Sequence, residues 1–195
     1  MTNTKFTSVD SWAFWDIPGK NLEQKSPQER QDIFGDNYVP NQFPNNKLKG
    51  DLNERLNKAK YIVVGMNPGD AAINQDNSKL FLNFHGAKKS ADYRFAAAIY
   101  GTEIWGSFMT DVSSTTESKS SKVKIHKADV INMEKHLDEL GVPDTAVLIA
   151  LGGKVNKALT KYANRPVKTM YHYSRANSYW KADKVHEQVM NILEK

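Results

Sequence analysis

The sequence predicts an α/β fold of three layers, in which a four-stranded parallel sheet lies between two layers of helices. Four short apolar segments have the length and the β-branched content of buried strands, and segments with helical periodicity alternate with them. The strand segments lie at 61–64, 104–110, 145–151 and 167–171. Buried strands that alternate with helices form parallel sheets covered on both faces, and this order therefore gives the fold class.

The segments between these strands carry the spacing and the end signals of helices. Val130, Met133, Leu137 and Leu140 recur at helical spacing, and Gly141 follows them as a stop. Helices are predicted at 51–60, 92–100, 127–140, 154–162 and 179–193. The segment Ser26-Pro27-Gln28-Glu29 adds a helix start near the N-terminus, because Ser is a favoured N-cap and Pro a favoured first residue.

The 195 residues are enough for one domain with its own core. We expect an N-terminal arm over residues 1–50 that packs on an α/β/α domain over residues 51–195. The arm carries an aromatic cluster, Trp12, Phe14 and Trp15, followed by an irregular segment rich in Asn and Pro. Docking of the arm on the domain is the expected role of these rings, and a platform for stacking nucleobases is the alternative.

Composition narrows the possible functions. The chain has no cysteine, which excludes disulfides, thiolate metal sites and cysteine nucleophiles. Its net charge of +5 is compatible with a nucleic-acid partner. No apolar run approaches the roughly 18 residues of a membrane span, and the first residues lack the apolar region of a signal peptide. We therefore expect a soluble, cytoplasmic protein with no membrane partner.

The segment Tyr61–Asp70 is the feature around which the rest of the chain is organised. A buried strand ends abruptly at Gly65, and Asn67, Pro68 and Gly69 follow as turn residues. In an open parallel sheet, ligands bind at the carboxyl ends of strands, which places this turn at a candidate site. A strand followed by an ordinary turn is the plain alternative.

Polar side chains also follow the other strands. The carboxyl ends of parallel strands meet at one edge of the sheet, so we expect Asn67, Asp111 and His172 to share a cleft. A loop of about twenty residues, 70–90, follows the first strand, and loops of this length in compact domains are usually functional. Phe81 or Phe84 in this loop supplies an aromatic face.

Gly65-Met-Asn-Pro-Gly69 resembles the first motif of the uracil-DNA glycosylase superfamily, in the form G-[MI]-N-P-G of its single-strand-selective and mismatch-specific branches. The segment 172–177 resembles the second motif, usually H-P-S followed by polar residues. Phe108-Met-Thr-Asp-Val112 is similar to the intermediate strand of the family, and Val147-Leu-Ile-Ala-Leu-Gly152 to its apolar strand followed by glycine. The resemblance covers residues 58–190.

The resemblance implies a uracil-DNA glycosylase-like fold and cleavage of the N-glycosidic bond of a base flipped out of DNA, without metal or organic cofactor. Asn67 would position the attacking water, and His172 would face O2 of the base. Phe84 or Phe81 would stack on the base. The expected substrate-binding residues further include the first-motif residues Gly65, Met66, Pro68 and Gly69, with Ser174 gripping phosphate and Arg175 or Asn177 contacting the DNA. Single-stranded or mismatched DNA is the implied partner of a protein expected to be a monomer.

Two residues depart from the family pattern. Tyr173 stands where the second motif usually has Pro, which changes the stiffness of the loop. Asp111 stands where many members have Asn, whose amide both donates to O4 and accepts from N3–H of uracil. An ionised carboxylate only accepts and favours an amino group such as that of cytosine, whereas a protonated one restores the pattern for uracil if its pKa is raised.

Three other functions compete with a glycosylase. The two departures together allow a non-catalytic protein of the same fold that binds nucleic acid. A small-nucleotide binder would use Gly65–Gly69 as a phosphate loop, although neither G-x-G-x-x-G nor a Walker motif is present. A Ser-His-Asp hydrolase lacks the G-x-S-x-G motif that its nucleophile would need.

Overall fold

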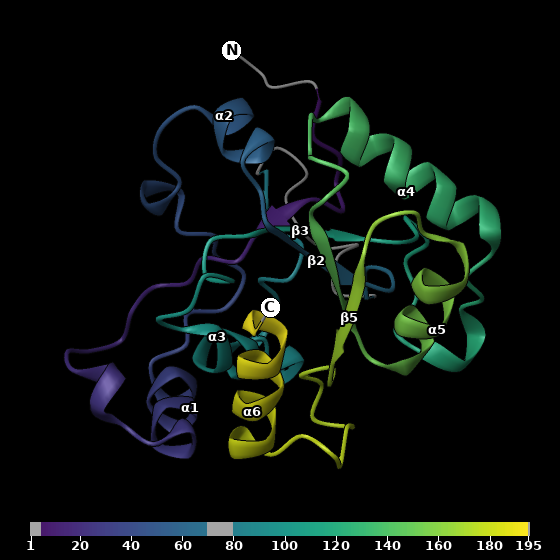
Figure 1. Ribbon diagram of the computed structural model, residues 1–195. Coiled ribbons are helices and arrows are strands. Elements are labelled where there is room, and N and C mark those ends of the chain that lie inside the picture. Colours follow the sequence, from purple (N-terminus) through teal and green to yellow (C-terminus); the bar gives the residue numbers. More distant parts are fainter. Residues whose placement is uncertain (1–4, 70–79, 195) are drawn as a thin grey trace.

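A single sheet runs through the protein in the computed structural model, which describes residues 5–69 and 80–194 (Figure 1). Within these residues the sheet has five strands in the order β1-β3-β2-β4-β5. The strands are β1 (Ser11–Trp12), β2 (Tyr61–Gly65), β3 (Phe108–Asp111), β4 (Val147–Leu151) and β5 (Val167–Met170). Asp70 and the part of the predicted loop at 71–79 lie outside the described residues.

The α/β class is confirmed, but the sheet is mixed rather than wholly parallel. Strands β3, β2, β4 and β5 run parallel to their neighbours. The additional strand β1 comes from the N-terminal arm and pairs antiparallel with β3, with Ser11 opposite Met109 and Trp12 opposite Phe108. As the structure describes it, β1 has two residues, and so short a strand carries no periodicity that a sequence pattern reveals.

The described helices agree with the predicted segments to within a few residues at their ends. They are α1 (Pro27–Asp36), α2 (Leu52–Asn57), α3 (Tyr93–Ile99), α4 (Lys127–Glu139), α5 (Gly153–Tyr162) and α6 (Ala182–Leu193), with short 3-10 turns at Leu22–Gln24, Asn45–Lys47, Lys88–Ser90 and Ser120–Lys122. The predicted start of α1 is a complete capping box, in which Ser26 and Glu29 each accept a backbone N–H of the other. None of the described helices is long and apolar enough to span a membrane.

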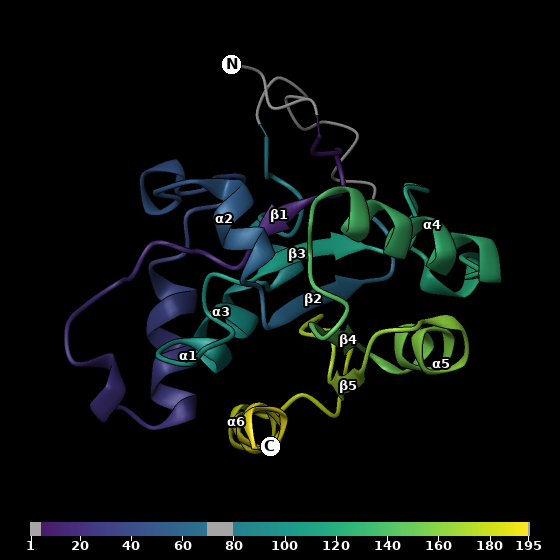
Figure 2. The same ribbon diagram turned by 45° about the horizontal axis from the view of Figure 1, so that its top comes forward.

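Alternate residues of the central strands face two separate cores. Ile62 and Val64 of β2 belong to the core beneath α4 and α5, whereas Val63 belongs to the core beneath α1, α3 and α6. Figure 2 shows these two groups of helices on opposite sides of the sheet. Both cores are fully buried at the sheet, and the carboxyl ends of the parallel strands are therefore held rigidly at one edge.

The aromatic residues of the arm are interior residues. Trp12, Phe14 and Trp15 are exposed by 1%, 9% and 4%, respectively. The indole N–H of Trp15 donates a 2.8 Å hydrogen bond to Asp92. These three rings are therefore unavailable as a surface on which nucleobases could stack.

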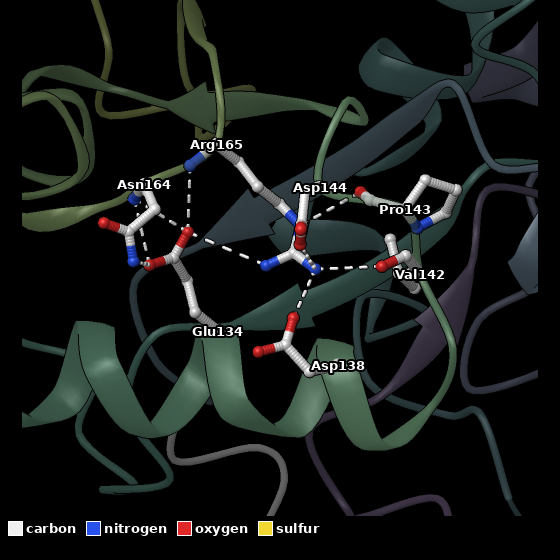
Figure 3. Close-up of polar contacts among 7 residues, drawn as sticks. All are labelled: Glu134, Asp138, Val142, Pro143, Asp144, Asn164 and Arg165. Atoms are coloured by element: carbon white, nitrogen blue, oxygen red, sulfur yellow. Dashed lines mark hydrogen bonds and ion pairs between the residues drawn. The ribbon is translucent and has the colours of Figure 1, made fainter.

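A buried arginine fastens α4 to the segment that enters β5 (Figure 3). The side chain of Arg165 is 3% exposed and pairs with Glu134 and Asp138 of α4 and with Asp144. Glu134 also accepts hydrogen bonds from the backbone N–H groups of Asn164 and Arg165. This network fixes the start of β5, whose far end delivers His172.

Candidate functional site

A cavity of about 570 Å³ opens at the carboxyl ends of the four parallel strands. It is lined by the loop 65–69 after β2, by Asp111 at the end of β3, by residues 151–155 around the start of α5, and by residues 172–174 and 176–177 after β5. Residues of the segment 83–90, together with Glu117 and Ser118, complete its wall. The prediction that Asn67, Asp111 and His172 share one cleft is thus confirmed.

Gly65 allows two of these walls to meet. A Cβ atom on Gly65 would lie 2.2 Å from Oδ1 of Asp111 and 2.7 Å from Cε1 of Phe84. Real Cβ atoms do not approach other atoms so closely, and the residue must therefore be glycine if the carboxyl group and the ring are to stay where they are. The sequence showed a turn glycine here, whereas the structure gives it a role in shaping the cavity.

Asn67 fastens two loops together. Its Nδ2 group lies 2.8 Å from the carbonyl oxygen of Pro68, 2.9 Å from that of Thr115 and 2.8 Å from that of Glu117. The backbone N–H of Glu117 in turn donates to Pro68. These bonds commit the N–H donors of Asn67 to the protein, which leaves Oδ1 as the atom of this side chain that could hold a water.

His172 lines the cavity, and a hydrogen bond fixes which of its ring nitrogens carries the proton. Its Nδ1 accepts a 3.0 Å hydrogen bond from the backbone N–H of Ser174, so the neutral ring carries its proton on Nε2. Burial lowers the pKa of His172 to about 4, and the ring is therefore neutral near pH 7. Tyr173 stacks on the ring at 4.5 Å between centroids.

Asp111 is a buried carboxyl group. It is 5% exposed, and burial raises its pKa to about 7. Its Oδ2 accepts a 2.8 Å hydrogen bond from Nδ2 of Asn83. Both protonation states are therefore accessible near neutral pH.

Ten of the predicted site residues line the cavity, and the other two lie elsewhere. Those at the cavity are Gly65, Met66, Asn67, Pro68, Gly69, Phe84, Asp111, His172, Ser174 and Asn177. Phe81 instead packs in the core against Phe6 and Phe43, with ring centroids 5.0 and 5.5 Å away. Arg175 is exposed and its guanidinium reaches Tyr93 at 3.5 Å. Of the two predicted aromatic faces, only Phe84 is placed to contact a ligand.

The polar residues of the 172–177 segment mainly shape it. The hydroxyl of Ser174 accepts from the N–H of Ala176 at 3.2 Å, and Nδ2 of Asn177 donates to the carbonyl of His172 at 2.8 Å. Internal hydrogen bonds of this kind fix a loop without regular secondary structure. They hold His172 in place, which is a role distinct from direct contact with DNA.

Sequence reasoning missed several parts of the lining, two of which bear on the chemistry of the site. Asn83 lies in the wall as a buried polar residue, and no pattern around it distinguishes it from its neighbours. Gly152 and Gly153 lie at the start of α5, which has no side-chain cap, so the first backbone N–H groups of this helix lie at the cavity. The Gly-Gly pair after a predicted strand was a visible signal for the second part.

Among the residues that the structure describes, no group of three or more His, Asp or Glu side chains is arranged to hold a metal ion. Comparison of the chain with models of protein families, with curated proteins and with solved structures finds no match.

Proposed function

We propose that the protein is a DNA glycosylase-like hydrolase with a uracil-DNA glycosylase-like α/β/α arrangement, which cleaves the N-glycosidic bond of uracil or a related damaged or deaminated base. The observation that carries this proposal is the hydrogen bond from Ser174 to Nδ1 of His172, which fixes Nε2–H as the donor of a neutral ring. A cavity of about 570 Å³ next to this ring has ample room for one base.

The proposed chemistry needs a donor at the point where negative charge develops. When the bond between C1′ and the base nitrogen breaks, its electron pair stays with the base, which becomes anionic. Nε2–H of His172 would donate to O2 of the departing base, as fixed donors stabilise oxyanions in other enzymes. A neutral imidazole suits this task because its N–H group can donate to the anion near pH 7, and no proton has first to be placed on a buried ring whose pKa is about 4.

The other half of the reaction is the attack of water on the sugar. The oxygen of the water forms the new bond to C1′, and its proton ends on the released base, so that one water is consumed for each base. Oδ1 of Asn67 is the proposed acceptor that orients this water. Phe84, whose ring edge lies against Gly65, would pack on the flat face of the base.

The phosphate groups of the DNA would meet the uncapped start of α5. The N-cap residue Gly152 offers no side-chain cap, and the partial positive charge of a helix N-terminus favours phosphate at this place. The net charge of +5 favours DNA in the same way, although less specifically.

One observation favours a second function, that of a non-catalytic nucleic-acid binder. The amide of Asn67 is occupied by three backbone carbonyl oxygens, so a purely structural role explains it as well. In that case the cavity would hold a base without cleaving its bond.

Base release from a panel of oligonucleotides separates the two functions. Single- and double-stranded substrates carrying uracil, cytosine or deaminated purines are incubated with the wild type, Asn67→Ala, His172→Ala and the exposed control His126→Ala. The glycosylase proposal expects release that falls by at least about 100-fold in the first two variants and persists in the control. DNA binding without release from any substrate would favour the non-catalytic function.

A further inference from the structure

Asn83 is hydrogen-bonded to Asp111 in the wall of the cavity. The Nδ2 group of Asn83 donates to Oδ2 of Asp111 at 2.8 Å and to the carbonyl of Val9 at 2.7 Å. The two N–H donors of this amide are thereby both used, and the side chain is only 8% exposed. Asn83 therefore cannot turn away from the carboxyl group without leaving a buried donor unpaired.

The other carboxyl oxygen, Oδ1, lies against Gly65, and both residues line the cavity. Oδ1 of Asp111 stands where a side chain of Gly65 would begin, 2.2 Å from the position of its missing Cβ. Among the described residues no donor is found on Oδ1, whereas Oδ2 is bonded to Asn83. We propose that Asn83 and Asp111 form a base-reading pair, in which Asn83 holds Oδ2 and Oδ1 alone reads the exocyclic group of the base.

This pair would select its base according to whether Asp111 carries a proton. A proton on Asp111 resides on Oδ1, because Oδ2 faces a donor, and the resulting O–H donates to a keto oxygen such as O4 of uracil. Without the proton, Oδ1 accepts from an amino group such as that of cytosine. The inference rests on the proposed function, and it names the substrate class as keto bases at low pH and amino bases at high pH.

The groups around Asp111 place the pKa of its carboxyl group near neutral pH. Burial raises the pKa of Asp111 to about 7, the donor Asn83 opposes the rise, and the charge of Asp10 on the arm adds to it. Asp10 is itself hydrogen-bonded to His136 of α4 at 2.8 Å. From the loop after β5, Tyr173 has a pKa raised well above its ordinary value, and it stays neutral, as does His172.

Two further charged residues, Glu117 and Lys154, line the cavity. Glu117 forms an ion pair with Lys122 at 3.6 Å, and Lys154 lies at the start of α5. Neither side chain is among the causes that shift the pKa of Asp111. The proton on Asp111 therefore depends chiefly on burial, Asn83 and Asp10.

The test measures selectivity for uracil over cytosine from pH 5.5 to 8.5. Two readouts are used: base release from single-stranded oligonucleotides, and binding of matched oligonucleotides whose 2′-fluoro sugars resist cleavage. The variants are Asp111→Asn, Asn83→Ala and the exposed controls Asp16→Asn and Asn53→Ala. In the wild type, the uracil-to-cytosine ratio should fall by about tenfold for each pH unit across this range, because the ratio of protonated to ionised Asp111 does so.

Each variant has its own expected result. In Asp111→Asn the new amide oxygen accepts from Asn83 and its nitrogen faces the cavity, so uracil is preferred at every pH. Asn83→Ala removes a donor that favours the ionised carboxylate and so raises the pKa of Asp111. The pH at which uracil and cytosine are treated equally therefore moves higher. Neither control should change the wild-type profile.

The two proposals fail in distinguishable ways. Selective binding that depends on pH, without base release, would overturn the glycosylase function and support the base-reading pair. Base release with a uracil-to-cytosine ratio that is constant with pH would support the enzyme and overturn the pair. A pH-dependent ratio that persists unchanged in Asp111→Asn would also overturn it.

Discussion

The backbone N–H of Ser174 lies 3.0 Å from Nδ1 of His172 and donates to it, although the two residues are only two positions apart. This short-range contact decides which ring nitrogen carries the proton in the cavity. Both residues lie in the loop after β5.

The first prediction concerns the charge and the donor of His172. His172→Phe should lower the rate of base release by about 100- to 1000-fold, because it removes the donor to the developing oxyanion. The matched change His126→Phe lies on an exposed residue and should have no effect. An NMR titration of the wild type should find His172 neutral down to about pH 4, and protonation near pH 6.5 would contradict this account.

The second prediction concerns space at Gly65. Gly65→Ala should remove activity and destabilise the protein by about 1–3 kcal/mol, because the new Cβ overlaps Asp111 and Phe84. Gly19→Ala is the matched control, since nothing lies within 4 Å of the Cβ it would add. Denaturant unfolding measures both variants, and equal stabilities would show that the cavity wall is not tightly packed at Gly65.

The third prediction separates two phenylalanines. Phe84→Ala should reduce base release more than stability, because its ring lies at the cavity. Phe81→Ala should do the opposite and cost about 3–5 kcal/mol of unfolding free energy, because its ring lies in the core among Phe6, Trp12 and Phe43. The account is contradicted if both variants lose activity in proportion to stability.

The fourth prediction concerns stability and pH at Asp111. The pKa of this carboxyl group is about 7 in the folded protein, against 3.8 for the free side chain, so the folded state binds the proton more tightly. Its contribution to stability is complete below pH 3.8 and is lost as the pH rises through 7. Asp111→Asn does not titrate, and its unfolding free energy relative to the wild type should rise by about 1.4 kcal/mol per pH unit between pH 5 and 7. A difference that stays flat over this range would refute the raised pKa.

The fifth prediction concerns the arginine at the start of β5. Arg165→Met should cost about 3–5 kcal/mol, because it leaves Glu134 buried without its cation. The added change Glu134→Gln should recover part of this loss, because it removes the unpaired charge. Lys135→Met, in an exposed ion pair with Glu139, serves as the control and should change stability by less than about 0.5 kcal/mol.

The sequence predicted the parallel part of the fold for a simple reason. The apolar runs of β2 and β4 are buried on both faces, and strands of this kind have a clear pattern. The strand β1 escaped prediction because its two residues pair only through the tertiary fold. The predicted second strand, 104–110, was placed too early, since residues 101–106 form turns that lead into β3 at Phe108.

The candidate site was predictable where residues follow strand ends. Asn67, Asp111 and His172 occupy such positions and meet at the cavity. The choice between Phe81 and Phe84 was beyond the sequence, because both residues adopt left-handed backbone conformations and only their tertiary contacts separate them. The roles of Asn67 and Asn83 as hydrogen-bonded braces also depend on backbone carbonyls that come from distant segments.

The most direct measurement for the central claim is the release of free base from a single-stranded uracil-containing oligonucleotide at pH 6, with protein in excess. At this pH the carboxyl group of Asp111 is mostly protonated and can donate to O4. The account predicts release that is lost in His172→Ala and Asn67→Ala. No release of uracil at pH 6 or of cytosine at pH 8, by a folded protein that binds the oligonucleotide, would contradict it.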